Sequence, residues 1–186
     1  MSSGASRRRF LEVSGAALLG GALFALEGCG GPHTALLRLP PTARREQAEI
    51  LNHVLDLEHS VIAAYTAGIP LLSASARDAA RRFLDQDLTH AGELAGLVKQ
   101  VGSKPHEPKA SYELGQPRRA ADVLRLLHAR EQQVIAAYLA ALPRLTPGPV
   151  RAAVASVMAN DAQHVSLLRA ALDRRPVPAA FVTASE

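Results

Sequence analysis

The sequence predicts an all-α protein: a bundle of four helices, arranged as two antiparallel hairpins joined by one long crossover. Apolar residues recur every three or four positions through four long segments, as on one face of an α-helix. The chain also repeats itself, with a similar pair of segments in each half. Short loops separate the segments within each half, and a long loop separates the halves. Short loops favour antiparallel neighbours, whereas the long loop favours a crossover.

Composition and charge narrow the class of protein. The chain has 186 residues, of which 48% are hydrophobic and 20% charged, so it can bury one core and form one domain. The formal net charge is only +4, there is no Trp, and no basic patch is interleaved with aromatic residues. We therefore expect no nucleic-acid partner.

The first 28 residues are predicted to form a signal peptide. Residues 6–11 read Ser-Arg-Arg-Arg-Phe-Leu and resemble the twin-arginine export signal. An apolar stretch follows over Val13–Leu26, but it is too short and too rich in Gly and Ala for a typical membrane span. A helical anchor that stays attached to the protein is the alternative reading. The twin-arginine route carries folded proteins, often with a cofactor already bound.

Cys29 is predicted to be a lipid anchor. It is the only cysteine, so an internal disulfide is excluded. Leu26, Glu27 and Gly28 precede it as in a lipobox, although glutamate is atypical at that position. We expect an exported protein of the cell envelope, tethered to the membrane by its signal peptide or by lipidated Cys29. Residues 29–41 would then be a linker.

The bundle is expected over residues 42–175, with a proline-containing tail over 176–186. Helices are predicted over residues 43–67, 75–101, 120–142 and 149–174. Ser75 and Asp78 match a capping box at the start of the second helix. Gly102 lies where a helix C-terminus commonly requires glycine, and Pro149 fits a first helical position.

The two halves of the bundle are related by an internal repeat. Residues 58–65 (EHSVIAAY) match residues 131–138 (EQQVIAAY) at an offset of 73. Asp87-x-x-His90 matches Asp161-x-x-His164 at an offset of 74. The loop over residues 102–118 can span up to ~56 Å at ~3.3 Å per residue. That exceeds the ~38 Å length of a 25-residue helix, so this loop can run the length of the bundle.

Six polar residues occupy positions on the apolar stripes of these helices, where they are predicted to meet at mid-bundle: Glu58, Asp87, His90, Glu131, Asp161 and His164. In an antiparallel hairpin, each Glu is expected to face the Asp of its own hairpin. Four buried carboxylates are costly, because each buried ion costs several kcal/mol and like charges repel. Protonation could relieve this cost, but two divalent cations would balance the four charges. Oxygen and imidazole donors favour iron or manganese, with zinc as an alternative.

This series of residues resembles the dimetal-carboxylate signature of ferritin-like proteins, in which one Glu alternates with Glu-x-x-His, twice over. The resemblance covers residues 43–174 and extends to exported bacterial ferritin-like domain proteins. It implies that Glu58 and Glu131 each bind one ion, that the two Asp residues bridge, and that each His caps one ion. Asp stands where the family usually carries Glu, so a single metal, a different metal pair or no metal are further alternatives.

The resemblance implies an oxidase, a ferroxidase or a peroxide-consuming activity, with O₂ or peroxide as a partner. The main alternative is a non-catalytic structural or interaction module of the envelope, whose Asp/His core is a metal-free hydrogen-bond network. A storage cage is a third reading that would require an oligomer, which a lipid tether disfavours.

Five other residues lie on or beside the helical faces that carry these six. Tyr65 and Tyr138 follow the two Glu residues by seven positions, and core packing is favoured over a role beside the metal. His128 is the best candidate for an extra ligand. His59 and Glu93 are expected on a solvated face.

Overall fold

The computed structural model describes residues 38–180, and these residues form four α-helices and no strand. The helices are α2 (Pro41–Gly68), α3 (Ala74–Gln100), α4 (Ala120–Ala141) and α5 (Gly148–Ala171), and a short 3₁₀ turn, η2 (Ile69–Leu71), follows α2. The prediction of an all-α four-helix bundle is confirmed. The predicted signal peptide, Cys29 and most of the linker lie outside the described residues. Within residues 38–180, no helix combines the length and apolar character that crossing a membrane requires.

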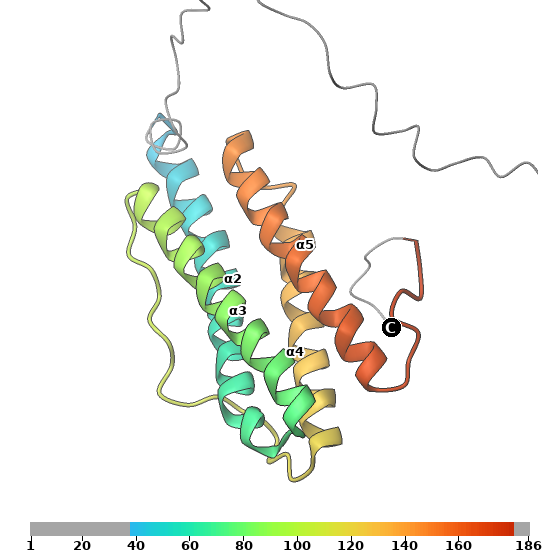
Figure 1. Ribbon diagram of the computed structural model, residues 1–186. Helices are drawn as coiled ribbons and strands as arrows, with labels where there is room; N and C mark the ends of the chain where they lie inside the picture. The colour runs from blue at the N-terminus through green and yellow to red at the C-terminus, as the bar shows by residue number, and fades with distance from the viewer. Residues whose placement is uncertain (1–37, 181–186) are drawn as a thin grey trace, which may run out of the picture.

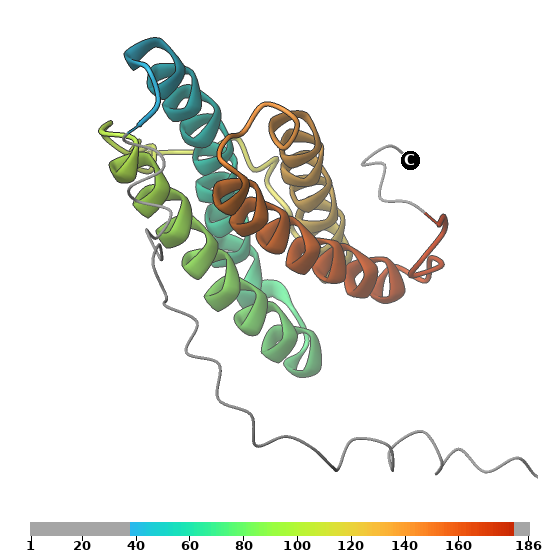
Figure 2. The same ribbon diagram turned by 90° about the horizontal axis from the view of Figure 1, so that it is seen from above.

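The four helices form two antiparallel hairpins, α2 with α3 and α4 with α5 (Figure 1). The chain between α3 and α4 runs back along the whole length of the bundle, as the predicted crossover does. Helix α2 packs closely against both α3 and α4, and α4 packs against α5. Helices α3 and α5 approach each other closely at few positions, and Figure 2 shows their axes diverging.

The start of α3 differs from the prediction, whereas its end agrees with it. The helix begins after Ser73, so the capping box predicted at Ser75 is not formed. At its other end Gly102 has a positive φ of 80°, where a Cβ would be strained. The Gly102 N–H donates to the Lys99 carbonyl, and the Ser103 N–H donates to that of Val98. This pair of bonds is a Schellman motif, so the predicted glycine stop is correct.

Asn52 fixes the crossover against α2. Its side-chain amide donates to the Lys104 carbonyl at 3.2 Å, and its oxygen accepts the His106 N–H at 2.9 Å. The His106 ring also contacts the Asp56 carboxylate at 3.0 Å. These contacts hold the long connection along one side of the bundle, away from the interior.

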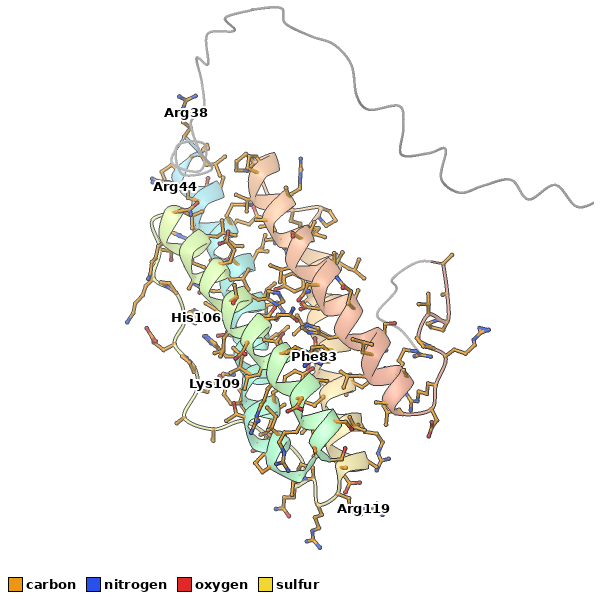
Figure 3. The ribbon with its side chains drawn as sticks, viewed as in Figure 1. Arg38, Arg44, Phe83, His106, Lys109 and Arg119 are labelled. Atoms are coloured by element: carbon orange, nitrogen blue, oxygen red, sulfur yellow. The ribbon has the colours of Figure 1, made fainter. Side chains whose placement is uncertain are left out.

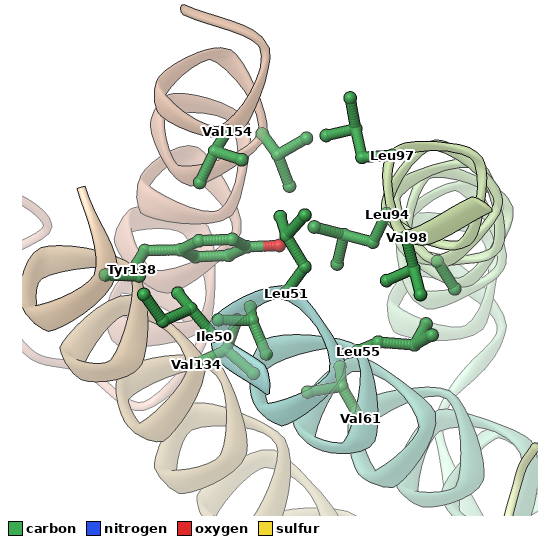
Figure 4. Close-up of a cluster of buried hydrophobic side chains, with 14 of the residues drawn as sticks. Ile50, Leu51, Leu55, Val61, Leu94, Leu97, Val98, Val134, Tyr138 and Val154 are labelled. Atoms are coloured by element: carbon green, nitrogen blue, oxygen red, sulfur yellow. The ribbon is translucent and has the colours of Figure 1, made fainter. Parts of the chain in front are cut away.

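Buried apolar side chains from all four helices form the core (Figure 4). Leu51 and Leu55 of α2, Leu94 of α3, Val134 of α4 and Val154 of α5 are each 1% exposed or less. In Figure 4 the ring of Tyr138 reaches from α4 into this cluster with its hydroxyl oxygen pointing inward. The core therefore surrounds at least one polar group that needs a partner.

Gly68 permits the close approach of α2 and α4. A Cβ built at this position would lie 2.5 Å from Cγ1 of Val123, which is fully buried. A valine on a helix has little freedom to move its methyl groups. The interface between the hairpins therefore requires a residue without a side chain here.

We expect Gly68→Ala to lower the free energy of unfolding by about 1 kcal/mol, because an overpacking cost of ~1–3 kcal/mol exceeds the helix-propensity gain of ~1 kcal/mol. Gly96→Ala is the matched control, since Gly96 lies within α3 with no atom within 4 Å of the added Cβ. That control should gain stability in urea unfolding. Equal gains in both variants would contradict the close packing at Gly68.

Candidate metal centre

All six residues predicted for the site are buried in the interior of the bundle. Glu58 of α2, Asp87 of α3, Glu131 of α4, and Asp161 and His164 of α5 are each 1% exposed or less. His90 of α3 is 8% exposed. The helical period places them inward, because each occupies a position on the apolar stripe of its helix. Phe83, which Figure 3 labels on α3, lies beside this cluster, because its ring stacks on the ring of His164.

The ligand atoms of these residues fall into two groups, within each of which all atoms lie within 4.8 Å of one another. One group contains Asp87, Glu131, Asp161 and His164, and the other contains Glu58, His90 and Asp161. Asp161 belongs to both groups, which is the position of a bridging carboxylate. Glu131 meets the Asp of its own hairpin, as expected. Glu58 instead groups with Asp161 of the other hairpin.

Two tyrosines hold the glutamates from across the bundle. The Tyr65 hydroxyl of α2 donates to Glu131 Oε1 of α4 at 2.7 Å. The Tyr138 hydroxyl of α4 donates in turn to Glu58 Oε1 of α2. Core packing was the favoured prediction for both tyrosines. Both rings are fully buried, but their hydroxyl groups also orient the two carboxylates.

The aspartates have no such partners. Both carboxylate oxygens of Asp87 and both of Asp161 are buried without a hydrogen bond. His90 Nδ1 lies 3.1 Å from Asp161 Oδ1, but it too makes no hydrogen bond. Buried polar atoms are nearly always paired, so five such atoms facing one small volume require an explanation. They fit a cation site, because lone pairs of oxygen and nitrogen are the donors that a divalent metal needs.

Burial changes the protonation of the carboxyl groups. It raises the pKa of Asp87 to about 10, with the charges of Glu131 and Asp161 as lesser causes. Burial also raises the pKa of Glu58 and of Glu131 well above the usual range, with Asp161 adding to both. The tyrosine hydroxyl groups act in the opposite direction on these two glutamates. Burial therefore favours the protonated forms of Glu58, Asp87 and Glu131 when no cation is bound.

Two contacts hold the ring of His164 in place. Its ring stacks on Phe83 with centroids 4.3 Å apart, and its Nε2 lies 2.7 Å from Oε1 of Gln86. Burial lowers the pKa of the His164 imidazole to about 4, although Asp161 acts against this change. A neutral imidazole is the form that binds a metal.

Gln86 and Phe83 are the contributors that sequence reasoning missed as parts of the site. Phe83 was visible only as a core residue. Gln86 is exposed, so it does not belong to the apolar pattern of its helix. The only signal in the sequence that connects it with the site is its position directly before Asp87. In the internal repeat, Gln86 corresponds to Asn160, the residue directly before Asp161.

The remaining candidates stay outside both groups. His128, the best candidate for an extra ligand, is buried, but it belongs to neither group. His59 is partly exposed and Glu93 fully so, and neither belongs to a group.

The raised pKa of Asp87 predicts how metal-free protein responds to pH. The folded state keeps this proton up to about pH 10, whereas the unfolded chain loses it near ~4, so folding binds a proton between these values. The stability from this group is fully present below about pH 4 and is lost as the pH rises toward 10, by ~1.4 kcal/mol per pH unit. The lowered pKa of His164 has the opposite effect only below about pH 6.5.

The free energy of unfolding in EDTA should therefore be lower at pH 9 than at pH 7, and Asp87→Asn should make this dependence shallower. Asp78→Asn changes an exposed carboxylate of the same helix and should leave the dependence unchanged. Identical slopes for wild type and Asp87→Asn would show that Asp87 is ionised in the core.

Comparison with known proteins identifies the family. A family model described as a ferritin-like domain matches residues 46–174. No curated protein matches the chain. A solved structure of a conserved hypothetical protein from Mycobacterium tuberculosis is 21% identical with a TM-score of 0.66, covering 75% of this chain and 97% of its own. A second, from Bacillus anthracis and described as a ferritin-like, diiron-carboxylate protein, is 21% identical with a TM-score of 0.57, covering 70% and 97%. With the family model spanning all four helices, this chain belongs to the family of ferritin-like domain proteins.

Proposed function

We propose that this chain is an exported ferritin-like protein that binds two divalent transition-metal ions and oxidises iron(II) with O₂ or peroxide. The observation that carries the proposal is the set of buried Asp87 and Asp161 oxygens that have no hydrogen-bond partner. A self-contained hydrogen-bond network, the main alternative, would satisfy its own acceptors. Four carboxylates facing one another instead match the charge of two divalent cations.

The two groups of donors assign the ligands in this proposal. Glu131, Asp87, Asp161 and His164 would hold one ion, and Glu58, His90 and Asp161 would hold the other. Iron or manganese is favoured because all donors are carboxylate oxygens or imidazole nitrogens, with no thiolate. The solved structure from Bacillus anthracis is described as a diiron-carboxylate protein, which supports the same choice.

When bound, such ions supply one-electron redox chemistry toward O₂ or peroxide. The chain's own residues prepare the place for it. The hydroxyl groups of Tyr65 and Tyr138 fix the orientation of the two glutamates. Burial of the six residues keeps bulk water away. Because Glu58, Asp87 and Glu131 have raised pKa values, each releases its proton when a cation takes its place.

Export and membrane attachment form the second part of the proposal. They rest on the twin-arginine motif at residues 6–11 and on the lipobox cysteine, Cys29. A protein folded before export would acquire its ions in the cytoplasm and carry them into the cell envelope.

After anaerobic loading with Fe²⁺ or Mn²⁺, the protein should contain two ions per chain. Mass spectrometry of the metal content measures this number. Glu58→Ala combined with Glu131→Ala should lose both, because each group loses the glutamate that only it contains. Glu49→Ala combined with Glu93→Ala removes two exposed acids as a control and should keep both ions. Full metal content in the first double variant would refute the ligand assignment.

Fractionation of the producing cells tests the envelope location. Arg7→Lys combined with Arg8→Lys should leave uncleaved protein in the cytoplasm, whereas Arg9→Lys, outside the paired arginines of the motif, should be exported normally. Cys29→Ala should be exported but released from the membrane fraction. Normal export of the first variant would rule out the twin-arginine route.

A further inference from the structure

The internal repeat pairs Gln86 with Asn160. They stand directly before Asp87 and Asp161 at the same offset of 74 residues that relates His90 to His164. Perfect symmetry would make the contact between Gln86 and His164 recur between Asn160 and His90. The Gln86 side chain is one methylene longer than that of Asn160. The two halves of the repeat therefore show what a longer and a shorter amide do beside equivalent histidines.

Gln86 orients His164 toward the ligand cluster. An amide oxygen only accepts, so the His164 Nε2–H donates to Gln86 Oε1 at 2.7 Å. In the neutral ring this bond leaves the Nδ1 lone pair free. His164 Nδ1 faces Glu131 Oε1 at 3.2 Å and Asp87 Oδ1 at 3.5 Å. Stacking on Phe83 holds the plane of the same ring.

Asn160 does not provide the matching contact. Its Oδ1 is buried without a hydrogen-bond partner, as expected of a side chain one methylene too short to reach the ring. His90 is also more exposed than His164, at 8% against 1%. The group around His90 contains three donors, whereas the group around His164 contains four.

We propose that the two ion positions are unequal, that the position at His164 binds its ion first and more tightly, and that Gln86 is the positioning residue responsible for much of the difference. This inference rests on the proposed function, because it concerns the order in which that site is filled. A partner that fixes the orientation of a metal-binding histidine is worth ~10–100-fold in affinity. The position at His90 would then be the readily exchanged one, where an ion could enter and leave while the other stays bound.

Titration of the metal-free protein with Mn²⁺, followed by calorimetry and by the EPR signal of free Mn²⁺, tests the inequality. Wild type should bind in two steps with distinct affinities. Gln86→Asn should weaken the tighter step by ~10–100-fold, and Asn160→Gln should tighten the weaker step. Gln86→Glu should keep wild-type affinity or exceed it, because a glutamate of the same length still offers an oxygen that accepts the His164 Nε2–H. Gln163→Asn shortens an exposed amide that bonds only to the Ala159 carbonyl and should change neither step.

The possible outcomes separate this inference from the proposed function. Two equal steps in wild type, or two unequal steps that Gln86→Asn leaves unchanged, would overturn the inference and leave the proposed metal site standing. No Mn²⁺ or Fe²⁺ binding by wild type would overturn both. Melting temperatures of the metal-free variants should match wild type within a few degrees, since Gln86 is exposed. A loss of affinity explained only by unfolding would count against the positioning role.

Discussion

The burial of four carboxyl groups at the centre of a small core is the constraint on which the rest of this structure depends. Glu58, Asp87, Glu131 and Asp161 are each 1% exposed or less, in an interior otherwise lined by Leu, Val and Tyr. Such charges are tolerated only when they are neutralised, by protons or by cations. The raised pKa values of Glu58, Asp87 and Glu131 favour protons, and the oxygens of the aspartates that lack hydrogen bonds fit cations.

The hairpin architecture makes this concentration of acids possible. Each helix contributes to the cluster, and several of its polar side chains contact the other hairpin. Tyr65 and Tyr138 cross between α2 and α4 in opposite directions, and each binds the other hairpin's glutamate. Where α3 and α5 diverge, His164 connects them through Gln86 and Phe83. The site is therefore also part of the interface between the halves of the bundle.

Sequence alone predicted much of the fold and all six members of the cluster, because both depend on periodicity and on an internal repeat. The inward direction of Asp87 and His90 follows from the helical period, and the crossover follows from loop length. The pairing of groups across the bundle could not be predicted in the same way. That Glu58 groups with Asp161 depends on how one hairpin lies against the other, which no local pattern fixes. Gln86 was missed because it is exposed, and the helix start was placed at Ser75 because Ser75 and Asp78 match a capping box that does not form.

The shared carboxylate of Asp161 has a mechanical consequence. An ion held between Asp161, Glu58 and His90 would tie α5 to α2 and α3, joining segments that are far apart along the chain. Such a tie acts as a cross-link, and it opposes separation of the hairpins in the way that a disulfide opposes the opening of a loop. This chain has no cysteine within the bundle to provide a disulfide. A metal ion bound at this position would therefore hold the two hairpins together where no disulfide can.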